Sequence, residues 1–521
     1  MKIKTATQEI VSMLYWSMLA ACTVGPGTVV TCARAGAEHG LNLIWALIFA
    51  SLLAYTLQEG TARLTIVSGM SLGQCLRMKY RHGPKLYNTA VICWIVAVSV
   101  FFGNTLYECN NWAGGMSAIY SLPGMENTNF IRISCCIAYG VVVYALLFWD
   151  KTDYLSVGLG VIMVGMIILF FLVVINLGLD FKRFGSGFIP NIPDGSSNLV
   201  LSLVGTTSIG FNLFLGSVMA KGRSLGSAQR GIGFSTVCAL EVSMLILIVG
   251  DGITDVDSKF SVANLAHLIA KTVGQVGLWV FGLGFIAAAL SSMLTVPLGA
   301  AITADSVFSS IEGEDLDFRC GEDGKEVAIS MLPQSSTAQS NNNGDPQENG
   351  GEDIEANPFD IGNQMAPMAS QEDLPSIKQE LKTFPRWIYM TLILIIVVIA
   401  VIVSSANLPT VDVIQVAQVF NGCLLPFFAT CLLLCLNDPQ FMSKQPQTWW
   451  NNIFLLVSVT ITLFLAANVF VHNIMNFLIT DEKIKMSIAG GVALIVMAIV
   501  TFTTSLSTEL RKSFTLYRPI S

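Results

Sequence analysis

Two short stretches of the sequence place helix-breaking and polar residues in the middle of long apolar runs. The first reads ACTVGPGTVVT over residues 21–31, and the second reads GTTSIGFN over residues 205–212. Proline lacks the N–H that a helix needs, and glycine lowers helix stability. Within a bilayer, unwound backbone is tolerated only where it is buried in protein or lines a polar cavity. The two stretches therefore predict a solute- or ion-binding site at mid-membrane depth, and a pair of packing kinks is the alternative.

Three charged residues also lie within apolar segments. Glu59 and Arg63 are four residues apart, so we expect an ion pair on one face of a helix, with a structural role at the end of its span. Glu108 shares a helical face with Asn104 and Asn111. We expect it near the outer end of its span, where a functional and a structural role are equally favoured.

The composition indicates which class of elements must hold these residues. Of the 521 residues, 53% are hydrophobic and 12% are charged, and the mean hydropathy is +0.64. A soluble domain is about 25% charged, which excludes a cytosolic enzyme, and the net charge of −7 argues against nucleic-acid binding. The sequence contains no nucleotide loop of the G-x(4)-G-K-[ST] type and no hydrolase constellation. We therefore expect neither an enzyme nor a bound cofactor.

Apolar runs long enough to cross a bilayer predict an all-α polytopic membrane protein of about 12 spans. The runs cover residues 10–33, 41–66, 87–108, 132–149, 154–178, 197–219, 232–250, 276–300, 387–405, 411–436, 449–474 and 487–506. Residues 261–275 are amphipathic and are expected at the membrane surface. Lys and Arg cluster before the first run and after the second, sixth and last, so both termini are expected in the cytoplasm.

One segment differs from the rest in composition. Residues 309–383 are rich in Ser, Asn, Gln, Gly and Pro and hold 16 acids against 4 bases, which leaves 24 bases and 19 acids in the remainder, a net charge of +5. Such a segment cannot bury a core. We expect spans 1–8 in residues 1–308, a disordered acidic cytoplasmic loop in residues 309–383, and spans 9–12 in residues 384–521. The loop is a candidate site for cytoplasmic partners.

Several motifs, in their order and spacing, resemble the natural-resistance-associated macrophage protein (Nramp) family of divalent-metal transporters. They are GPGTVVT in the first span, LQEGTARLTIVSGMSLG in the second, GLGFIAAALSS with Pro297-Leu298 in the eighth, and AQVFNGCLLPFF in the tenth. The resemblance covers nearly the whole chain outside residues 309–383. It implies a LeuT-like fold, in which spans 1–5 and 6–10 form a 5+5 inverted repeat and two additional helices follow.

The positions at which this sequence differs from the family's motifs are those of the family's metal site. The family's span-1 motif, D-P-G-N, supplies an Asp and an Asn ligand, and here Gly25 and Thr28 stand at these positions. The family's span-6 motif, M-P-H, matches Ile209, Gly210 and Phe211. The resemblance thus implies a divergent member whose altered site has lost its thioether, its carboxylate and its proton-linked His, so that no charged group remains.

A cation in such a site would face neutral oxygens from backbone carbonyls, hydroxyls and amides. The candidate substrate-binding positions are Ala21, Val24, Gly25, Thr28, Thr206, Thr207, Ser208, Ile209, Asn212, Gln418 and Asn421, of which Thr28, Thr206, Gln418 and Asn421 are the candidate metal ligands. Gln418 and Asn421 are included because they match the family's metal-facing amides. Without a soft ligand, the preference for Mn²⁺ or Fe²⁺ over Mg²⁺ should weaken. Mg²⁺ usually keeps several of its waters, so a neutral cavity suits it.

We therefore expect a secondary transporter or facilitator for divalent cations of the Mg²⁺, Mn²⁺ and Fe²⁺ class, working by alternating access with weak or absent proton coupling. An amino-acid or other small charged-solute carrier of the same superfold is the first alternative, because half-helix N-termini favour a carboxylate. The second alternative is a non-transporting, receptor-like or scaffold protein.

Overall fold

The structure, a computed structural model, describes residues 23–80, 89–125, 127–149, 153–253, 260–308, 384–442 and 445–475, with short pieces between 489 and 498. In these ranges the chain is almost entirely helical. The elements are α2 (Pro26–His39), η1 (Gly40–Leu43), α3 (Ile44–Ser68), α4 (Leu72–Lys79), α5 (Thr89–Tyr120), α6 (Asn129–Trp149), α7 (Asp153–Leu177), α8 (Phe181–Ser186), α9 (Ser197–Thr207), α10 (Gly210–Ala220), α11 (Leu225–Asp251), α12 (Val262–Val273), α13 (Gln275–Phe308), α15 (Arg386–Ser405), α16 (Thr410–Leu436), α17 (Pro439–Met442) and α18 (Trp449–Met475).

Ten described segments are long and apolar enough to cross a membrane. The first, Pro26–Ser68, combines α2, η1 and α3, so it corresponds to the predicted spans 1 and 2. The predicted surface helix is α12, which is shorter than a span. The predicted acidic loop, the two chain ends and most of the predicted twelfth span lie outside the described residues.

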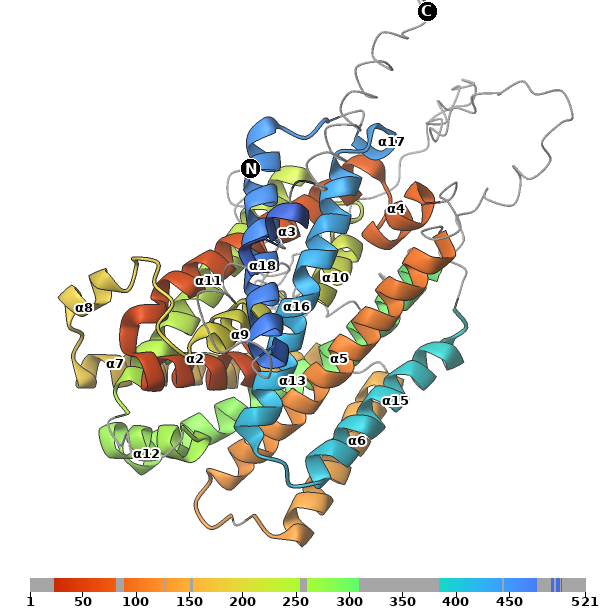
Figure 1. The fold of residues 1–521 in the computed structure, drawn as a ribbon. Helices are drawn as coiled ribbons and strands as arrows, with labels where there is room; N and C mark the ends of the chain where they lie inside the picture. Colours follow the sequence, from red (N-terminus) through yellow and green to blue (C-terminus); the bar gives the residue numbers. More distant parts are fainter. Residues whose placement is uncertain are drawn as a thin grey trace, which may run out of the picture.

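The pair α9 and α10 forms the centre of the bundle. All of the most apolar window of Ser197–Ala220 is buried, whereas the corresponding windows of α6 and α15 are 22% and 28% buried. Figure 1 shows α6 and α15 together at the edge of the bundle, where they pack on each other. Their exposed apolar side chains, such as Phe130 and Val141, form a surface suited to lipid, whose tails are as apolar as leucine.

Glycines let α2 and α11 pack with their backbones in close contact. A Cβ on Gly36 would lie 2.0 Å from the carbonyl oxygen of Leu247, and a Cβ on Gly250 would lie 2.1 Å from the carbonyl oxygen of Ala33. Small residues at membrane helix interfaces allow this approach. Since α11 also packs against α3, it holds the short helix α2 in place beside the centre of the bundle.

Candidate functional site

The first break lies directly before α2. Gly25 is the N-cap of this helix in an extended conformation, with φ −106° and ψ −171°, and Pro26 is its first residue. Proline is favoured there because its missing N–H would have no helical partner and its fixed φ suits a helix. A Cβ on Gly114 of α5 would lie 2.2 Å from the Cβ of Pro26. The long helix α5 therefore runs directly against the break.

The second break separates α9 from α10. Ser208 is the C-cap of α9, and Ile209 is the N-cap of α10. The Thr207 hydroxyl donates to the Leu203 carbonyl at 2.9 Å, and the Ser208 hydroxyl donates to the Ala50 carbonyl of α3, also at 2.9 Å. These two predicted binding hydroxyls thus use their protons on backbone carbonyls, and the Ser208 bond fastens the break to α3.

The two breaks meet at a pair of threonines. The hydroxyl oxygens of Thr28 and Thr206 are 2.9 Å apart, and both residues are fully buried. The Thr28 hydroxyl also bonds to the carbonyl oxygen of Thr23. Two of the predicted metal ligands, separated by 178 positions in the sequence, are therefore in direct contact.

Gln418 of α16 lies against both breaks. A Cβ on Gly27 would lie 1.9 Å from the Gln418 Nε2, and a Cβ on Gly205 would lie 2.0 Å from the Gln418 carbonyl oxygen. Glycine at both positions lets Gln418 lie between the two breaks. Asn421 lies nearly one turn further along α16, where its Oδ1 is 3.1 Å from the Cβ position of Gly103 on α5. The structure thus joins Thr28, Thr206 and Gln418 and places Asn421 toward α5.

Several buried polar atoms beside the breaks have no hydrogen-bond partner among the described residues. They are both side-chain polar atoms of Asn110, Asn212 and Gln418, Oδ1 of Asn111, Nδ2 of Asn421, Oγ of Ser292 and Oε1 of Glu108. Burying such groups without a partner costs free energy, and most native polar groups avoid it. These atoms are therefore suited to a solute, an ion or its waters. We call Glu108, Asn110, Asn111, Ser292 and Gln418 the break cluster.

Glu108 differs most from its predicted position. The sequence places it at the outer end of a span covering 87–108, but α5 continues to Tyr120 and Glu108 is 0% exposed. Its Oε2 accepts a hydrogen bond from Asn111 Nδ2 at 3.1 Å. Asn111 Oδ1 in turn lies 3.9 Å from the Cβ position of Gly25. Asn111 thus lies between the Glu108 carboxyl group and the first break, and the prediction that no charged group contacts the solute stays a prediction.

Sequence reasoning missed two residues that the structure places at the first break. Asn110 Nδ2 lies 3.0 Å from the Cβ position of Gly27, and Ser292 Oγ of α13 lies 2.7 Å from the Cβ position of Gly25. The sequence predicts a polar stripe on α5 that contains Asn104, Glu108 and Asn111 but not Asn110. For Ser292 the available signal was a pair of hydroxyls, Ser291 and Ser292, inside an apolar run.

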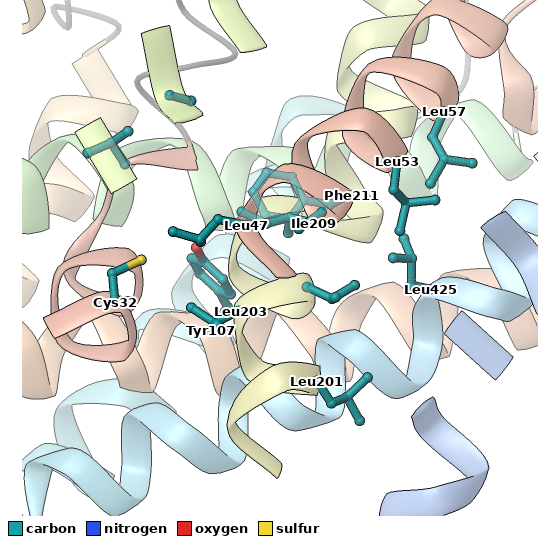
Figure 2. Packing of buried hydrophobic residues seen from close by; sticks show 14 of the residues in the cluster. Cys32, Leu47, Leu53, Leu57, Tyr107, Leu201, Leu203, Ile209, Phe211 and Leu425 are labelled. Atoms are coloured by element: carbon teal, nitrogen blue, oxygen red, sulfur yellow. The ribbon is translucent and has the colours of Figure 1, made fainter. Parts of the chain in front are cut away.

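The remaining predicted positions contribute little side-chain chemistry. The side chains of Val24 and Ile209 are buried in the main hydrophobic cluster. Figure 2 shows Ile209 with Phe211 among leucines from α3, α9 and α16. Phe211 also meets the ring of Tyr107 edge-on, with centroids 6.2 Å apart. Only backbone atoms of Val24 and Ile209 are thus available to a solute, and Ala21 lies outside the described residues.

The predicted ion pair on α3 is present. Arg63 Nη2 lies 3.0 Å from Glu59 Oε2, and Gln229 of α11 donates to Glu59 Oε1 at 2.9 Å. Glu59 and Arg63 are both buried. These three residues, called the α3 network below, satisfy both oxygens of the carboxylate and join α3 to α11.

A cavity of about 730 Å³ opens beyond the far end of α2, lined by residues of α2, α5, α12 and α16. In it Arg34 forms an ion pair with Glu38 at 2.7 Å and also donates to Gln415 of α16. Gln415 precedes Gln418 by three residues, so both lie on one face of α16. The Arg34–Gln415 contact therefore joins a residue that lines the cavity to the helix that carries Gln418.

The donors at the breaks suit hard cations. Across the described ranges, no group of three or more His, Cys, Asp or Glu side chains could hold a metal ion. Amide, hydroxyl and carbonyl oxygens are the ligands that Mg²⁺ and Ca²⁺ prefer, whereas thioether and imidazole favour transition metals. The site thus offers oxygen donors with a single carboxyl group nearby.

Comparison with known proteins agrees with this architecture. A family model described as "Natural resistance-associated macrophage protein-like" matches residues 17–321 and 362–472. A divalent metal cation transporter MntH of Staphylococcus aureus is 24% identical over 326 residues, covering 57% of this chain and 70% of its own. An MntH of Deinococcus radiodurans is 29% identical over 203 residues, covering 38% of this chain and 43% of its own.

Solved structures show the same fold. The manganese transporter of Eremococcus coleocola aligns with a TM-score of 0.62 at 15% identity, covering 97% of this chain and 95% of its own. This likeness confirms the predicted all-helical LeuT-like fold, and with the ten membrane-crossing segments it makes the protein an integral, multi-pass membrane protein. Since the family model covers most of the sequence, the chain belongs to the Nramp family.

Proposed function

We propose that this protein is a secondary carrier that moves divalent metal cations across a membrane by alternating access. The observation that carries the proposal is Gln418, whose amide is 0% exposed and has no partner for either polar atom among the described residues. It lies between two broken helices, next to the Thr28–Thr206 pair. A partly hydrated cation would supply the missing partners. The relatives of this chain that are named divalent metal cation transporters support the same class of substrate.

The proposed selectivity is broad and includes Mg²⁺. The position that holds a methionine in the family is Ile209, whose side chain is buried in the apolar core. Without a thioether, little in the site favours Mn²⁺ over Mg²⁺. Phe211 replaces the family's proton-linked His, so we propose weak or absent proton coupling.

The proposed orientation places both termini in the cytoplasm, with residues 309–383 on the same side. Arg77 and Lys79 on α4 supply positive charge next to the second span, as cytoplasmic connections usually do. Lys79 is paired with Asp438 at 2.6 Å, which ties α4 to the segment after α16. Partners of the 309–383 segment belong to the same proposal.

Flux through proteoliposomes tests the transport proposal. We expect uptake of Mn²⁺ and Mg²⁺ at rates within about tenfold of each other, without acidification of the lumen. Gln418→Leu should reduce uptake of both ions at least about tenfold, since it removes the central amide. Gln440→Leu changes an exposed glutamine on α17 and serves as the matched control. Strong proton influx driven by Mn²⁺, or full activity of Gln418→Leu, would contradict the proposal.

A second candidate substrate is a small carboxylate such as an amino acid. Two helices of 14 and 11 residues, α2 and α10, begin at the breaks, and the positive end of a helix dipole favours an anion. The same vesicles loaded with radiolabelled amino acids distinguish the candidates. Amino-acid uptake without metal uptake would replace the metal proposal, and no uptake of either would favour a non-transporting protein.

A further inference from the structure

A buried arginine lies where the connection from α5 to α6 meets the connection from α15 to α16. Figure 1 shows both connections at the same end of the bundle. Arg132 of α6 is 8% exposed. Its Nε donates to the Ser405 carbonyl at 3.1 Å, its Nη1 to Asn127 Oδ1 at 3.2 Å, and its Nη2 to Asn129 Oδ1 at 2.7 Å. Arg132 therefore joins the two connections through neutral oxygen atoms.

The positive charge of Arg132 has no counter-charge among the described residues. None of the ion pairs formed there includes this guanidinium. Its three hydrogen bonds use one N–H each, and both Nη atoms carry a second N–H. Burying a charge is costly unless an opposite charge and hydrogen bonds compensate it. The guanidinium is thus suited to a further, negatively charged acceptor.

A cavity of about 70 Å³ lies beside Arg132, lined by residues of α5, α6, α15 and α16. Of the described residues, no Asp or Glu lines it. Tyr120 and Ser404 line it, and the hydroxyl oxygen of each is buried without a hydrogen-bond partner in the described ranges. A hydroxyl can donate its proton to an anion. The cavity therefore offers one positive charge and two unused hydroxyl donors.

These donors distinguish a small anion from water. A water molecule takes up about 30 Å³, so the cavity has room for two of them. Waters would leave the charge of Arg132 uncompensated, whereas an anion the size of chloride accepts hydrogen bonds from the guanidinium and from both hydroxyls and also neutralises the charge. Asn127 and Asn407 line the cavity and are exposed, so an ion can reach it from solvent.

We propose that Arg132, Tyr120 and Ser404 form a binding site for a small monovalent anion of the chloride class. One guanidinium neutralises one monovalent ion, whereas a divalent anion would retain a net negative charge in a buried setting. An organic anion such as gluconate is too large for a cavity of about 70 Å³. The bound anion joins α5, α6 and α15 at one point and so stabilises their packing. The inference goes beyond the proposed transport function and does not depend on it.

Thermal unfolding of the full-length protein in detergent tests the site, with chloride compared against gluconate at equal ionic strength. Chloride should raise the midpoint by at least about 2 °C. Arg132→Gln should abolish this rise. Ser404→Ala removes only one hydroxyl and should weaken the apparent affinity for chloride at least about fivefold. Ser405→Ala is the matched control, because Ser405 does not line the cavity and the variant keeps the carbonyl that Arg132 uses.

Broadening of the ³⁵Cl NMR signal by the same four proteins gives a second readout, which reports bound chloride whatever the stability of each variant. We expect the wild type and Ser405→Ala to broaden the signal more than Arg132→Gln does. Neither readout requires a divalent ion, so a failure of the transport proposal leaves both of them intact.

Three results would overturn the proposal. The first is an equal midpoint in chloride and gluconate, together with equal broadening by the wild type and Arg132→Gln. The second is an equal loss of the chloride effect in Ser404→Ala and Ser405→Ala. The third is a chloride effect that is absent from the wild type and present in Glu126→Gln. Glu126 lies outside the described residues, and this result would identify it as the counter-charge of Arg132.

Discussion

Two buried polar groups in this protein differ in how their atoms are satisfied. In the α3 network, both oxygens of Glu59 accept hydrogen bonds, from Arg63 at 3.0 Å and from Gln229 at 2.9 Å, although the Nε of Arg63 has no partner among the described residues. In the break cluster, neither polar atom of Gln418 or Asn110 has a partner among the described residues. A carboxylate that is satisfied at both oxygens fixes helices to each other, whereas side chains with no partner at any polar atom reduce stability unless something else binds them. The difference indicates that the α3 network serves the fold and the break cluster serves a ligand.

Breaking the α3 network should have the largest effect on stability. Arg63→Met leaves Glu59 buried without its counter-ion, so we expect a loss of about 3–5 kcal/mol in the free energy of unfolding. Chemical or thermal unfolding in detergent measures it. The double variant Glu59→Gln/Arg63→Met removes both charges and should recover most of the loss. An Arg63→Met protein as stable as wild type would show that the pair has no structural role.

The contact that brings Gln418 to the breaks depends on a glycine and can be broken directly. A Cβ on Gly205 would lie 2.0 Å from a backbone oxygen of α16, which cannot rotate away. Gly205→Ala should therefore cost about 1–3 kcal/mol and reduce uptake by separating α9 from α16. Gly160→Ala on α7 is the control, because no atom of the described residues lies within 4 Å of its Cβ position. There we expect a gain of about 0.5–1 kcal/mol, from reduced freedom of the unfolded chain.

Restoring the family's Asp and Asn ligands at Gly25 and Thr28 should raise the affinity of the site for divalent cations. The double variant Gly25→Asp/Thr28→Asn restores the family's span-1 pattern, but the new Cβ at Gly25 would lie 2.7 Å from Ser292 Oγ. Adding Ser292→Ala supplies the room. We expect calorimetry to show affinity for both Mn²⁺ and Mg²⁺ about tenfold higher in this triple variant, since a carboxylate attracts either ion. Unchanged affinity for both ions would place the divalent site elsewhere.

Much of the fold could be predicted from the sequence because a bilayer leaves few choices. Backbone groups in hydrocarbon must be satisfied within helices, so long apolar runs reveal the spans. The break between α9 and α10 was visible for the same reason, as glycine and hydroxyl residues in an apolar run predict an interruption. The ion pair on α3 followed from its spacing of four residues.

The composition of the break cluster could not be predicted in the same way. Asn110, Asn111 and two glycines make the end of α5 look like the start of a loop, so the predicted span stopped at residue 108. What keeps this stretch helical is tertiary packing against α2 and α13, which a hydropathy profile of one segment does not contain. The side of α5 that faces Gly27 likewise depends on the rotation of the helix, and Asn110 was therefore missed.

Substitution of Asn110 should have the smallest effect on stability. It is also the most direct test of the difference between the α3 network and the break cluster. In the part of the chain that the structure describes, neither polar atom of the Asn110 side chain has a partner, and the residue is 0% exposed. Asn110→Leu keeps the volume and removes the unpartnered atoms, so the free energy of unfolding should stay the same or rise by up to about 1 kcal/mol. Metal uptake should fall severalfold, because an amide beside Gly27 and Gln418 is lost. An Asn110→Leu protein that is less stable than wild type but transports normally would assign this amide to the fold, and the distinction between the break cluster and the α3 network would no longer hold.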